Sequence, residues 1–309
     1  MKILDGVFEG GGVRGIAHVG AVQAIEEHGY EWNRLAGTSS GSIVAALLAC
    51  GYSGSELLEI MESLDYQDFM KKNWINHIPF IGNGINLAFK GGLYKNRFQE
   101  EWINELLAKK NVHSFRDLEE GKLKIIVSDI TNGRMAVFPD DLEKYGETYD
   151  FSIAKAVTMS STIPYYFQPI KWKTNKYKSP IYMVDGGILS NFPIWIFDTP
   201  YMPKWPTFGF HFTREETNPD PSENLGTIGI YKSIFKTMLQ AHDLRHLDKE
   251  ADTRTVKIPT GNISITDFGL SESQEQWLYH SGYDAASTFL ETWNFEEYKR
   301  KFRSEFVNV

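Results

Sequence analysis

The first fifty residues alternate between short apolar strands and helices, and a glycine-rich turn follows each strand. A strand is expected at residues 3–8, and residues 16–27 have the period of an amphipathic helix that ends near Gly29. A short strand at residues 34–36 follows. Residues 43–50 then form a helix that is apolar on every side, which is typical of a buried helix. Strands and helices in alternation favour an α/β sheet with helices on both faces.

The rest of the chain continues this alternation, and no linker divides it. We therefore expect a single domain over residues 1–309, with a motif-bearing core at about 3–212 and a C-terminal helical part at about 213–309. Further strands are expected at 123–128, 135–138, 181–184 and 207–212, and further helices over 55–64, 95–110, 225–247 and 271–291.

Charge and composition exclude several classes of partner. The 309 residues include 32 Lys and Arg against 40 Asp and Glu, which gives a net charge of −8. This leaves no basic excess for a nucleic-acid footprint. The single cysteine, Cys50, excludes an intrachain disulfide. We therefore expect a globular protein without a nucleic-acid partner.

The N-terminal segment does not have the pattern of a secretory signal, because Asp5 and Glu9 interrupt its apolar run. The longest uncharged apolar run, Ile43 to Cys50, is also far shorter than the about 20 residues of a membrane-spanning helix. A cytoplasmic location is therefore expected. Peripheral contact with a membrane and export by a route without a signal peptide are the open alternatives.

A glycine-rich loop lies between the first strand and the first helix. Free backbone N–H groups at such a loop can hold a phosphate or the oxyanion of a tetrahedral intermediate. The spacing also matches the dinucleotide-binding pattern Gly-x-Gly-x-x-Gly, with Glu31 near the place of a ribose-binding acid, and a purely structural turn is a third interpretation. The loop alone leaves all three open; its residues are Gly10, Gly11, Gly12, Val13, Arg14 and Gly15.

A second glycine motif, Gly37-Thr38-Ser39-Ser40-Gly41, lies between a strand and the buried helix. This is Gly-x-Ser-x-Gly in the context of a nucleophile elbow, where flanking glycines leave room for a sharp turn that exposes the serine hydroxyl. The helix N-terminus also favours negative charge near Ser39. The alternative is that Ser39 or Ser40 only caps the helix.

The third motif, Asp185-Gly186-Gly187, follows the strand at 181–184. Because ligands of α/β sheets gather at the C-terminal ends of the strands, we expect the Asp185 carboxylate at the same sheet edge as the other two motifs. A turn that begins with Asp is the alternative. Together the three motifs supply the groups of acyl transfer, namely a nucleophile, a base and oxyanion donors.

The sequence offers no clear histidine base. Of eight histidines, only His211 lies near a strand end at a place suited to a third catalytic residue, while His18 is expected to be a packed helix residue. His242 and His246 have the spacing of a metal pair but lack the glutamate of the His-Glu-x-x-His pattern. We therefore expect no metal site.

In this order the three motifs resemble those of the patatin-like phospholipase family, in its bacterial form. The resemblance implies a three-layer α/β/α sandwich with a central, mostly parallel sheet, and a Ser–Asp dyad that needs no histidine and no cofactor. By position, Ser39 is the nucleophile and Asp185 the base. The amides around Gly10, Gly11, Gly12 and Val13 form the oxyanion hole, Arg14 helps to orient the loop, and Gly37, Gly41, Gly186 and Gly187 support the motifs.

Other segments extend the resemblance over about residues 3–290. The segment 160–164 resembles the Ser-Ser-x-x-Pro segment of the family, and Asn191 and Pro193 follow the third motif at the usual offsets. The implied chemistry requires a partly desolvated Asp185 with a raised pKa close to Ser39, because a free Asp with a pKa near 3.9 is a weak base.

Two stretches lack a clear pattern. Residues Met70 to Gly92 are either a flexible cap over the acyl site or a packed connecting segment. Residues Tyr165 to Lys178 alternate lysines with aromatic residues, which suits an anionic membrane surface or a solvated hairpin, and the net charge of −8 favours the hairpin.

The leading hypothesis is a lipid acyl hydrolase, a phospholipase A or carboxylic ester hydrolase, that acts on lipid or phospholipid esters through an acyl-serine intermediate. The alternatives are a catalytically inactive lipid-binding module and a nucleotide-binding oxidoreductase built on Gly10, Gly12 and Gly15.

Overall fold

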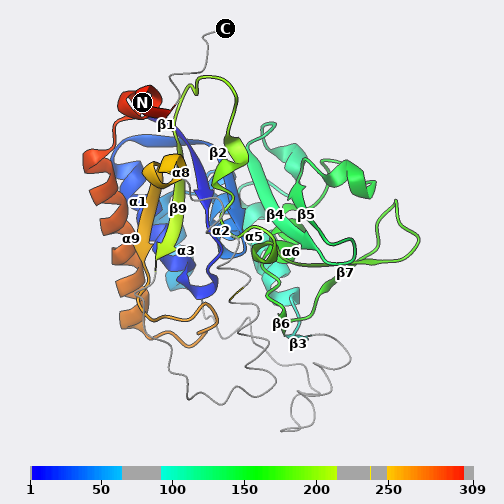
Figure 1. Cartoon of the computed structure of the whole chain (residues 1–309). Coiled ribbons are helices and arrows are strands. Elements are labelled where there is room, and N and C mark those ends of the chain that lie inside the picture. Colours follow the sequence, from blue (N-terminus) through cyan, green and yellow to red (C-terminus); the bar gives the residue numbers. More distant parts are fainter. Residues whose placement is uncertain (1, 65–91, 214–236, 238–248, 303–309) are drawn as a thin grey trace.

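The computed structural model describes residues 2–64, 92–213, 237 and 249–302. In this part of the chain, an eight-stranded sheet has the strand order β10-β9-β1-β2-β4-β8-β7, with β5 also paired to β4, and β3 pairs with β6 separately (Figure 1). The strands are β1 (Lys2–Phe8), β2 (Tyr30–Thr38), β3 (Gly92–Tyr94), β4 (Leu123–Asp129), β5 (Arg134–Phe138), β6 (Tyr165–Phe167), β7 (Ile170–Trp172), β8 (Ile181–Asp185), β9 (Thr207–Thr213) and β10 (Thr255–Pro259).

The sheet is mostly parallel, as expected. Strands β10, β9, β1, β2 and β4 are parallel to one another, whereas β5 and β8 are antiparallel to β4, and β7 is antiparallel to β8. In the parallel part, Phe8 lies beside both Gly37 and Phe210. The ends of β1, β2 and β9 therefore meet at one edge of the sheet.

Helices lie on both faces of the sheet, which confirms the predicted three-layer class. The strand β1 shows the division: Leu4 and Phe8 pack with the main helical layer, and Val7 packs on the other face against Phe192 and Ile194. Among the described elements, that second layer contains a 3-10 helix, η7 (Ile194–Phe197), and α8 (Lys249–Thr253). The main layer contains α1 (Gly15–Glu27), α2 (Ser40–Ala49), α3 (Gly54–Glu62), α5 (Arg97–Lys109), α6 (Ile153–Ser160) and α9 (Glu272–Thr292).

The helix α9 lies along α1, although the two are far apart in the sequence (Figure 1). After α9 the described chain ends with α10 (Phe295–Phe302). The part after residue 213, expected to be helical, also contributes the edge strand β10. Neither β10 nor the helix α6 was predicted from the sequence. The helix expected over 225–247, with His242 and His246, lies outside the described residues apart from residue 237. Most of the segment 70–92, interpreted as either a cap or a packed connection, also lies outside them.

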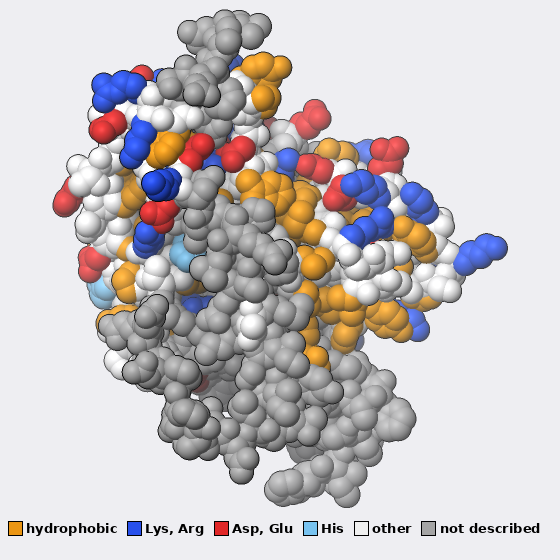
Figure 2. Space-filling view, in the orientation of Figure 1, with side chains coloured by type: hydrophobic (Ala, Val, Ile, Leu, Met, Phe, Trp, Pro, Cys, Tyr) orange, Lys and Arg blue, Asp and Glu red, His pale blue; other side chains and the backbone are white. Residues whose placement is uncertain are grey.

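In the lysine-rich stretch Tyr165 to Lys178, β6 pairs with β3, whereas β7 pairs antiparallel with β8, the next strand in the chain. The second part of the stretch is therefore one strand and the connection of a β-hairpin, and its four lysines are exposed, as the solvated hairpin requires. Its Trp172 is 2% exposed and packs against Phe138 in the core, so this ring is not available to a membrane surface. Figure 2 shows acidic and basic side chains interspersed with hydrophobic ones over this side of the molecule. Among the described helices, none has both the length and the apolar character needed to cross a membrane.

Candidate active site

Ser39 lies at the turn between β2 and α2, where its backbone has φ 52° and ψ −126°. A positive φ is strained for a residue with a Cβ, and such strain is typical of functional turns. The turn also excludes side chains on both sides. A Cβ on Gly37 would lie 2.2 Å from the Gly41 carbonyl oxygen, and a Cβ on Gly41 would lie 2.3 Å from the Phe8 carbonyl oxygen. Both positions therefore require glycine.

Ser39 and Asp185 are in direct contact. Ser39 Oγ donates a hydrogen bond to Asp185 Oδ2 at 2.7 Å, and Gly187 N–H donates to Asp185 Oδ1 at 2.8 Å. Asp185 is 2% exposed, and this burial raises its pKa to about 7 although the hydrogen bonds from Ser39 and Gly187 lower it. The raised pKa agrees with the sequence-based expectation, and it suits a group that accepts a proton at neutral pH.

The two residues meet because β2 and β8 approach each other end to end. β5 occupies one side of β4, while β2 and β8 both pair with the other side, β2 in parallel and β8 antiparallel. β2 ends with Thr38 beside Ile126, and β8 ends with Asp185 beside the next residue, Val127. Asp185 therefore lies with the other two motifs at the C-terminal ends of β1 and β2, as expected, but β8 reaches this place from the opposite direction because it is antiparallel to β4.

The end of α6 holds the backbone of both residues. Ser39 N–H donates to Ser160 Oγ at 2.9 Å, and Asp185 N–H donates to the Thr162 carbonyl at 2.9 Å. The sequence indicates the segment 160–164 only by its resemblance to the family, and its contacts with Ser39 and Asp185 were not predicted. The Ser-Ser-x-x-Pro pattern was the sequence signal for these contacts, because the hydroxyl of a buried serine beside a helix end can accept a hydrogen bond from a neighbouring amide.

The glycine loop after β1 lies against Ser39, since a Cβ on Gly10 would be 3.0 Å from Ser39 Cβ. Gly12 has φ +57°, and a Cβ there would lie 1.9 Å from the Ile265 carbonyl oxygen. Within the part of the chain that the structure describes, Gly12 N–H has no hydrogen-bond acceptor. The nearby amides do have acceptors: Gly10 N–H donates to Asn191 O at 3.2 Å, Gly11 N–H to Ser40 Oγ at 3.0 Å, and Val13 N–H to Ile265 O at 3.2 Å.

Arg14 also contacts the glycine loop through its side chain. Its Nε donates to the Gly11 carbonyl at 3.3 Å, and its Nη1 donates to Thr260 Oγ1 at 3.3 Å. Its guanidinium lies 5.1 Å from the centre of the Phe212 ring, within the range of a cation–π contact. Arg14 is 6% exposed. These contacts agree with the expected role of Arg14 in orienting the loop.

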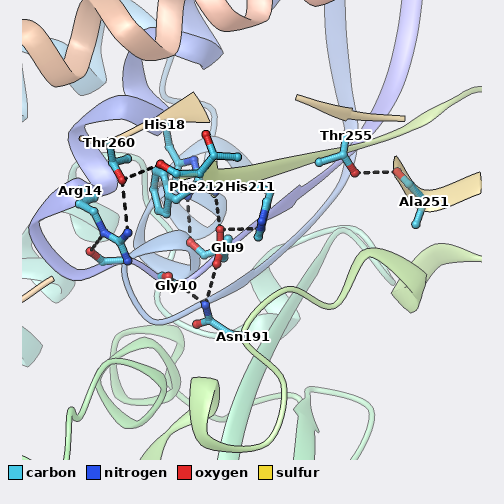
Figure 3. A network of polar contacts seen from close by, with 12 residues as sticks. Glu9, Gly10, Arg14, His18, Asn191, His211, Phe212, Ala251, Thr255 and Thr260 are labelled. Atoms are coloured by element: carbon cyan, nitrogen blue, oxygen red, sulfur yellow. Dashed lines mark hydrogen bonds and ion pairs between the residues drawn. The ribbon is translucent and has the colours of Figure 1, made fainter. Parts of the chain in front are cut away.

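A buried polar network centred on Glu9 lies directly before the loop (Figure 3). Asn191 Nδ2 donates to Glu9 Oε1 at 2.8 Å, Phe212 N–H donates to Oε2, and His211 Nδ1 lies 2.9 Å from Oε2 in an ion pair. Burial by itself would raise the pKa of Glu9, but the charge and hydrogen bond of His211 and the charge of Arg14 hold it below its ordinary value. Glu9 is therefore an ionised carboxylate. Sequence reasoning did not single out this residue as part of the site.

His211 contacts Glu9 and not the Ser39–Asp185 pair. The structure therefore does not place His211 as a third catalytic residue. His18 is buried, as expected, and stacks on Phe212 with 4.2 Å between ring centres. Burial lowers the pKa of His18 to about 4, so its ring is neutral at pH 7. Its Nε2 lies 2.9 Å from the Glu9 carbonyl, which only accepts, and Nε2 therefore carries the proton.

Two adjoining cavities open at Ser39. A small one, of about 10 Å³, lies between Ser39, Asp185 and the three glycines Gly10, Gly11 and Gly12. A larger one, of about 70 Å³, also contacts Ser39 and is otherwise mostly apolar. Its apolar lining comes from Val13, Ile43, Val44, Met61, Leu64, Trp102, Ile163, Phe167 and Phe268. The arrangement suits a polar reacting group beside a long apolar one.

The position of Glu31 argues against the dinucleotide interpretation. Glu31 lies near the start of β2, beside Ile3 near the start of β1. The glycine loop follows the other end of β1, after Phe8. A ribose-binding acid is needed near the loop, at the end of the second strand. Glu31 is therefore at the wrong edge of the sheet for that role.

Comparison with known proteins agrees with this geometry. A family model described as Patatin-like phospholipase matches residues 6–198, which is more than half of the chain and includes all three motifs. The chain belongs to the patatin-like phospholipase family. Membership in the patatin-like phospholipase family supports a lipid-hydrolysing enzyme.

Relatives of this patatin-like chain include a bacterial and a viral protein. Uncharacterized protein YqhO of Bacillus subtilis (strain 168) is 38% identical over 294 residues, which cover 94% of this chain and 99% of that protein. Probable lipid hydrolase 463L of Invertebrate iridescent virus 6 is 28% identical over 194 residues, which cover 61% of each chain. Among solved structures, VipD from Legionella pneumophila is similar with a TM-score of 0.57 and 18% identity, over 94% of this chain and 67% of that one. This last likeness shows the shared fold.

Proposed function

We propose that this chain is a serine acyl hydrolase that cleaves fatty-acyl esters of lipids or phospholipids through the pair Ser39 and Asp185. The observation that carries the proposal is the 2.7 Å hydrogen bond from Ser39 Oγ to Asp185 Oδ2, at the mouth of an apolar cavity. A hydroxyl that donates to a buried carboxylate of raised pKa can lose its proton to that carboxylate as it attacks a carbonyl carbon.

In the acylation half-reaction, Ser39 Oγ forms a bond to the ester carbonyl carbon while its proton moves to Asp185 Oδ2. The carbonyl oxygen becomes an oxyanion. When this intermediate collapses, the bond to the alcohol oxygen breaks, and Asp185 returns the proton to that oxygen. The product is an acyl ester on Ser39, and the alcohol or lysolipid leaves.

In the deacylation half-reaction, water attacks the acyl carbon and gives one proton to Asp185. The bond between the acyl carbon and Ser39 Oγ then breaks, and Ser39 Oγ recovers its proton from Asp185. A free fatty acid leaves. One carboxylate thus serves as base and then acid in each half, and the cycle needs no further residue for proton transfer.

Gly12 N–H supports an oxyanion hole at the glycine loop. Gly12 lines the small cavity beside Ser39, and its N–H has no acceptor among the described residues, so this N–H is available to a developing oxyanion. Gly11 lines the same cavity, but its N–H donates to Ser40 Oγ and joins the hole only if the Ser40 hydroxyl moves. The positive end of α2, which begins directly after Ser39, adds to this stabilisation.

The larger cavity supports a lipid substrate. Its lining is mostly apolar and includes Ser39, as needed for a fatty-acyl chain whose ester lies at the hydroxyl. The relative named Probable lipid hydrolase 463L agrees with this substrate class. Peripheral contact with a membrane, from which such a substrate comes, is part of the proposal.

The test is intact-mass analysis after treatment with a fluorophosphonate, on the wild type and on Ser39→Ala, followed by turnover of p-nitrophenyl esters and phospholipid vesicles. We expect one adduct on the wild type, mapped to the peptide of Ser39 and absent from the variant. Asp185→Asn should abolish turnover as completely as Ser39→Ala. Vesicle binding with neither adduct nor turnover, in folded protein with detergent micelles present, would instead identify an inactive lipid-binding module.

A further inference from the structure

The carboxylate of Glu9 is buried one residue before the glycine loop, and the proposed proton transfers do not use it. It accepts hydrogen bonds from Asn191 Nδ2 on one oxygen and from Phe212 N–H on the other, and His211 Nδ1 lies 2.9 Å from this second oxygen in an ion pair. Two of these three partners belong to β9, which is parallel to β1. An ionised carboxylate that is 4% exposed requires such partners, because burial of an unpaired charge is very costly.

Asn191 connects this carboxylate to the loop. The same Nδ2 group that donates to Glu9 Oε1 also donates to the Gly10 carbonyl at 3.2 Å, and Gly10 N–H donates back to the Asn191 carbonyl at 3.2 Å. The Gly10 peptide is therefore fixed on both its N–H and its C=O side. Gly10 in turn is packed so closely on Ser39 that a Cβ would meet it at 3.0 Å.

The main chain of Glu9 is fixed as well. Its N–H donates to the Phe210 carbonyl at 3.1 Å, and its carbonyl accepts from His18 Nε2 at 2.9 Å. The side chain and main chain of one residue thus bind β9, α1 and the segment of Asn191 together at the point where β1 becomes the loop. Figure 3 shows these groups converging on Glu9.

We infer that Glu9, held by the ion pair with His211, is a positioning residue that fixes the glycine loop against Ser39 through Asn191. The inference rests on the proposed function, because it assigns the loop to the oxyanion. Donors of an oxyanion hole act only if they are held in place before the reaction, and a shift of about 1 Å can reduce the rate about 100-fold.

The ion pair with His211 also offsets the negative charge of Glu9. An uncompensated carboxylate next to the loop would oppose the negative charge that develops on the substrate oxygen. The positive charge of His211 offsets it on one side and that of Arg14 on the other. Loss of His211 therefore both removes one of the contacts of the carboxylate and leaves Arg14 as the cation that offsets its charge near the loop.

The test compares three variants with p-nitrophenyl butyrate, a soluble ester, together with the rate of fluorophosphonate labelling. Glu9→Gln keeps the size of the side chain but turns one acceptor oxygen into a donor. His211→Leu removes the partner, and His211→Gln supplies an N–H in its place. We expect Glu9→Gln and His211→Leu to lower kcat and the labelling rate about 10- to 100-fold, with KM changed by less than about threefold. His211→Gln should recover most of the loss.

Asp5→Asn is the matched control. Asp5 is also a buried carboxylate on β1, 1% exposed and paired with Arg34 at 2.6 Å, but it lies away from the loop. This variant should lower stability and leave kcat of the folded protein within about twofold of the wild type. The control thus separates a general loss of packing from a loss of positioning.

Two failures are distinguishable. A wild type that neither hydrolyses esters nor labels overturns the proposed function, and the positioning role with it. An active wild type whose folded Glu9→Gln and His211→Leu variants keep kcat and labelling within about twofold overturns the positioning role alone. Equal kcat losses in Asp5→Asn, or in both His211 variants, would do the same.

Discussion

The backbone amide of Ser39 donates a hydrogen bond of 2.9 Å to Oγ of Ser160, a residue 121 positions later in the chain. Two residues further along, the carbonyl of Thr162 accepts from the amide of Asp185 at 2.9 Å. The end of α6 thus binds the backbones of both residues of the proposed catalytic pair. Their 2.7 Å contact depends on this third segment as well as on the strands β2 and β8.

Ser160→Ala should lower both activity and stability. The variant leaves the buried N–H of Ser39 without an acceptor, which costs about 1–3 kcal/mol of unfolding free energy. Because that amide holds the strained turn, we also expect kcat to fall about tenfold. Urea unfolding and ester hydrolysis measure the two effects.

Ser152→Ala is the control for this experiment, because Ser152 caps the other end of the same helix by accepting from Lys155 N–H. It should cost about 1 kcal/mol and leave kcat unchanged. If Ser160→Ala lowers stability as Ser152→Ala does but keeps full kcat, the contact with Ser39 has no part in the reaction.

The rate should depend on the ionisation of Asp185. Burial raises its pKa to about 7, and the proposed base is active only as the carboxylate. The value of kcat/KM for a soluble ester should therefore rise with pH up to about 7 and level off above it, because the fraction of ionised Asp185 follows that curve. A pH–rate profile on p-nitrophenyl butyrate measures it. A profile that levels off near pH 4 would mean that Asp185 is an ordinary carboxylate.

The same raised pKa predicts an effect of pH on stability. The folded protein binds a proton at Asp185 up to about pH 7, whereas the unfolded chain releases it near the ordinary value of 3.8. Because the folded state binds more protons between these values, this residue lowers the stability of the wild type as the pH rises from about 4 to about 7.

Asp185→Asn removes this penalty. The variant should be more stable than the wild type at pH 8, and its advantage should grow by about 2–3 kcal/mol between pH 5 and pH 8. Urea unfolding of both proteins at the two pH values provides the measurement. An advantage that is the same at both would contradict a raised pKa in the folded state.

The turn at Ser39 stores backbone strain that glycine would release. Its φ of 52° is unfavourable for serine and alanine alike, but not for glycine. Ser39→Gly should therefore be more stable than Ser39→Ala by about 1 kcal/mol, although both variants lack the hydroxyl and should be inactive. Thermal unfolding of the two variants measures this difference in stability. Equal stability of Ser39→Gly and Ser39→Ala would show that the turn is unstrained.

Local patterns were sufficient to predict the elbow and the loop. The glycines around Ser39 and the strand and helix on either side of it follow from short-range periodicity and from the need for a sharp turn. The contact of Ser39 with Asp185 was also expected, because the family resemblance joined two motifs that are far apart in the chain. The raised pKa of Asp185 followed from the chemistry that this pair must perform.

The direction of the strands and the tertiary contacts between distant residues could not be predicted from local sequence patterns. Nothing in the residues around Asp185 shows that β8 runs antiparallel to β4, because the direction of a strand depends on the path of the chain between strands. The partners of Glu9 were hidden for the same reason: Asn191 and His211 are about two hundred residues away from it. Glu9 looked like a charge that ends an apolar strand, whereas tertiary contacts make it a buried ion.

The large cavity should limit the length of the acyl chain. Ile43 lies on α2 four residues after Ser39 and lines this cavity, so a larger side chain there would fill space that the proposed acyl chain occupies. For Ile43→Trp we expect kcat/KM for p-nitrophenyl decanoate to fall more than about tenfold, while the value for the acetate ester changes by less than about threefold. Ile130→Trp is the control, because Ile130 is 49% exposed and does not line the cavity. Equal losses for both esters would place the acyl chain elsewhere, since a blocked cavity must discriminate by length.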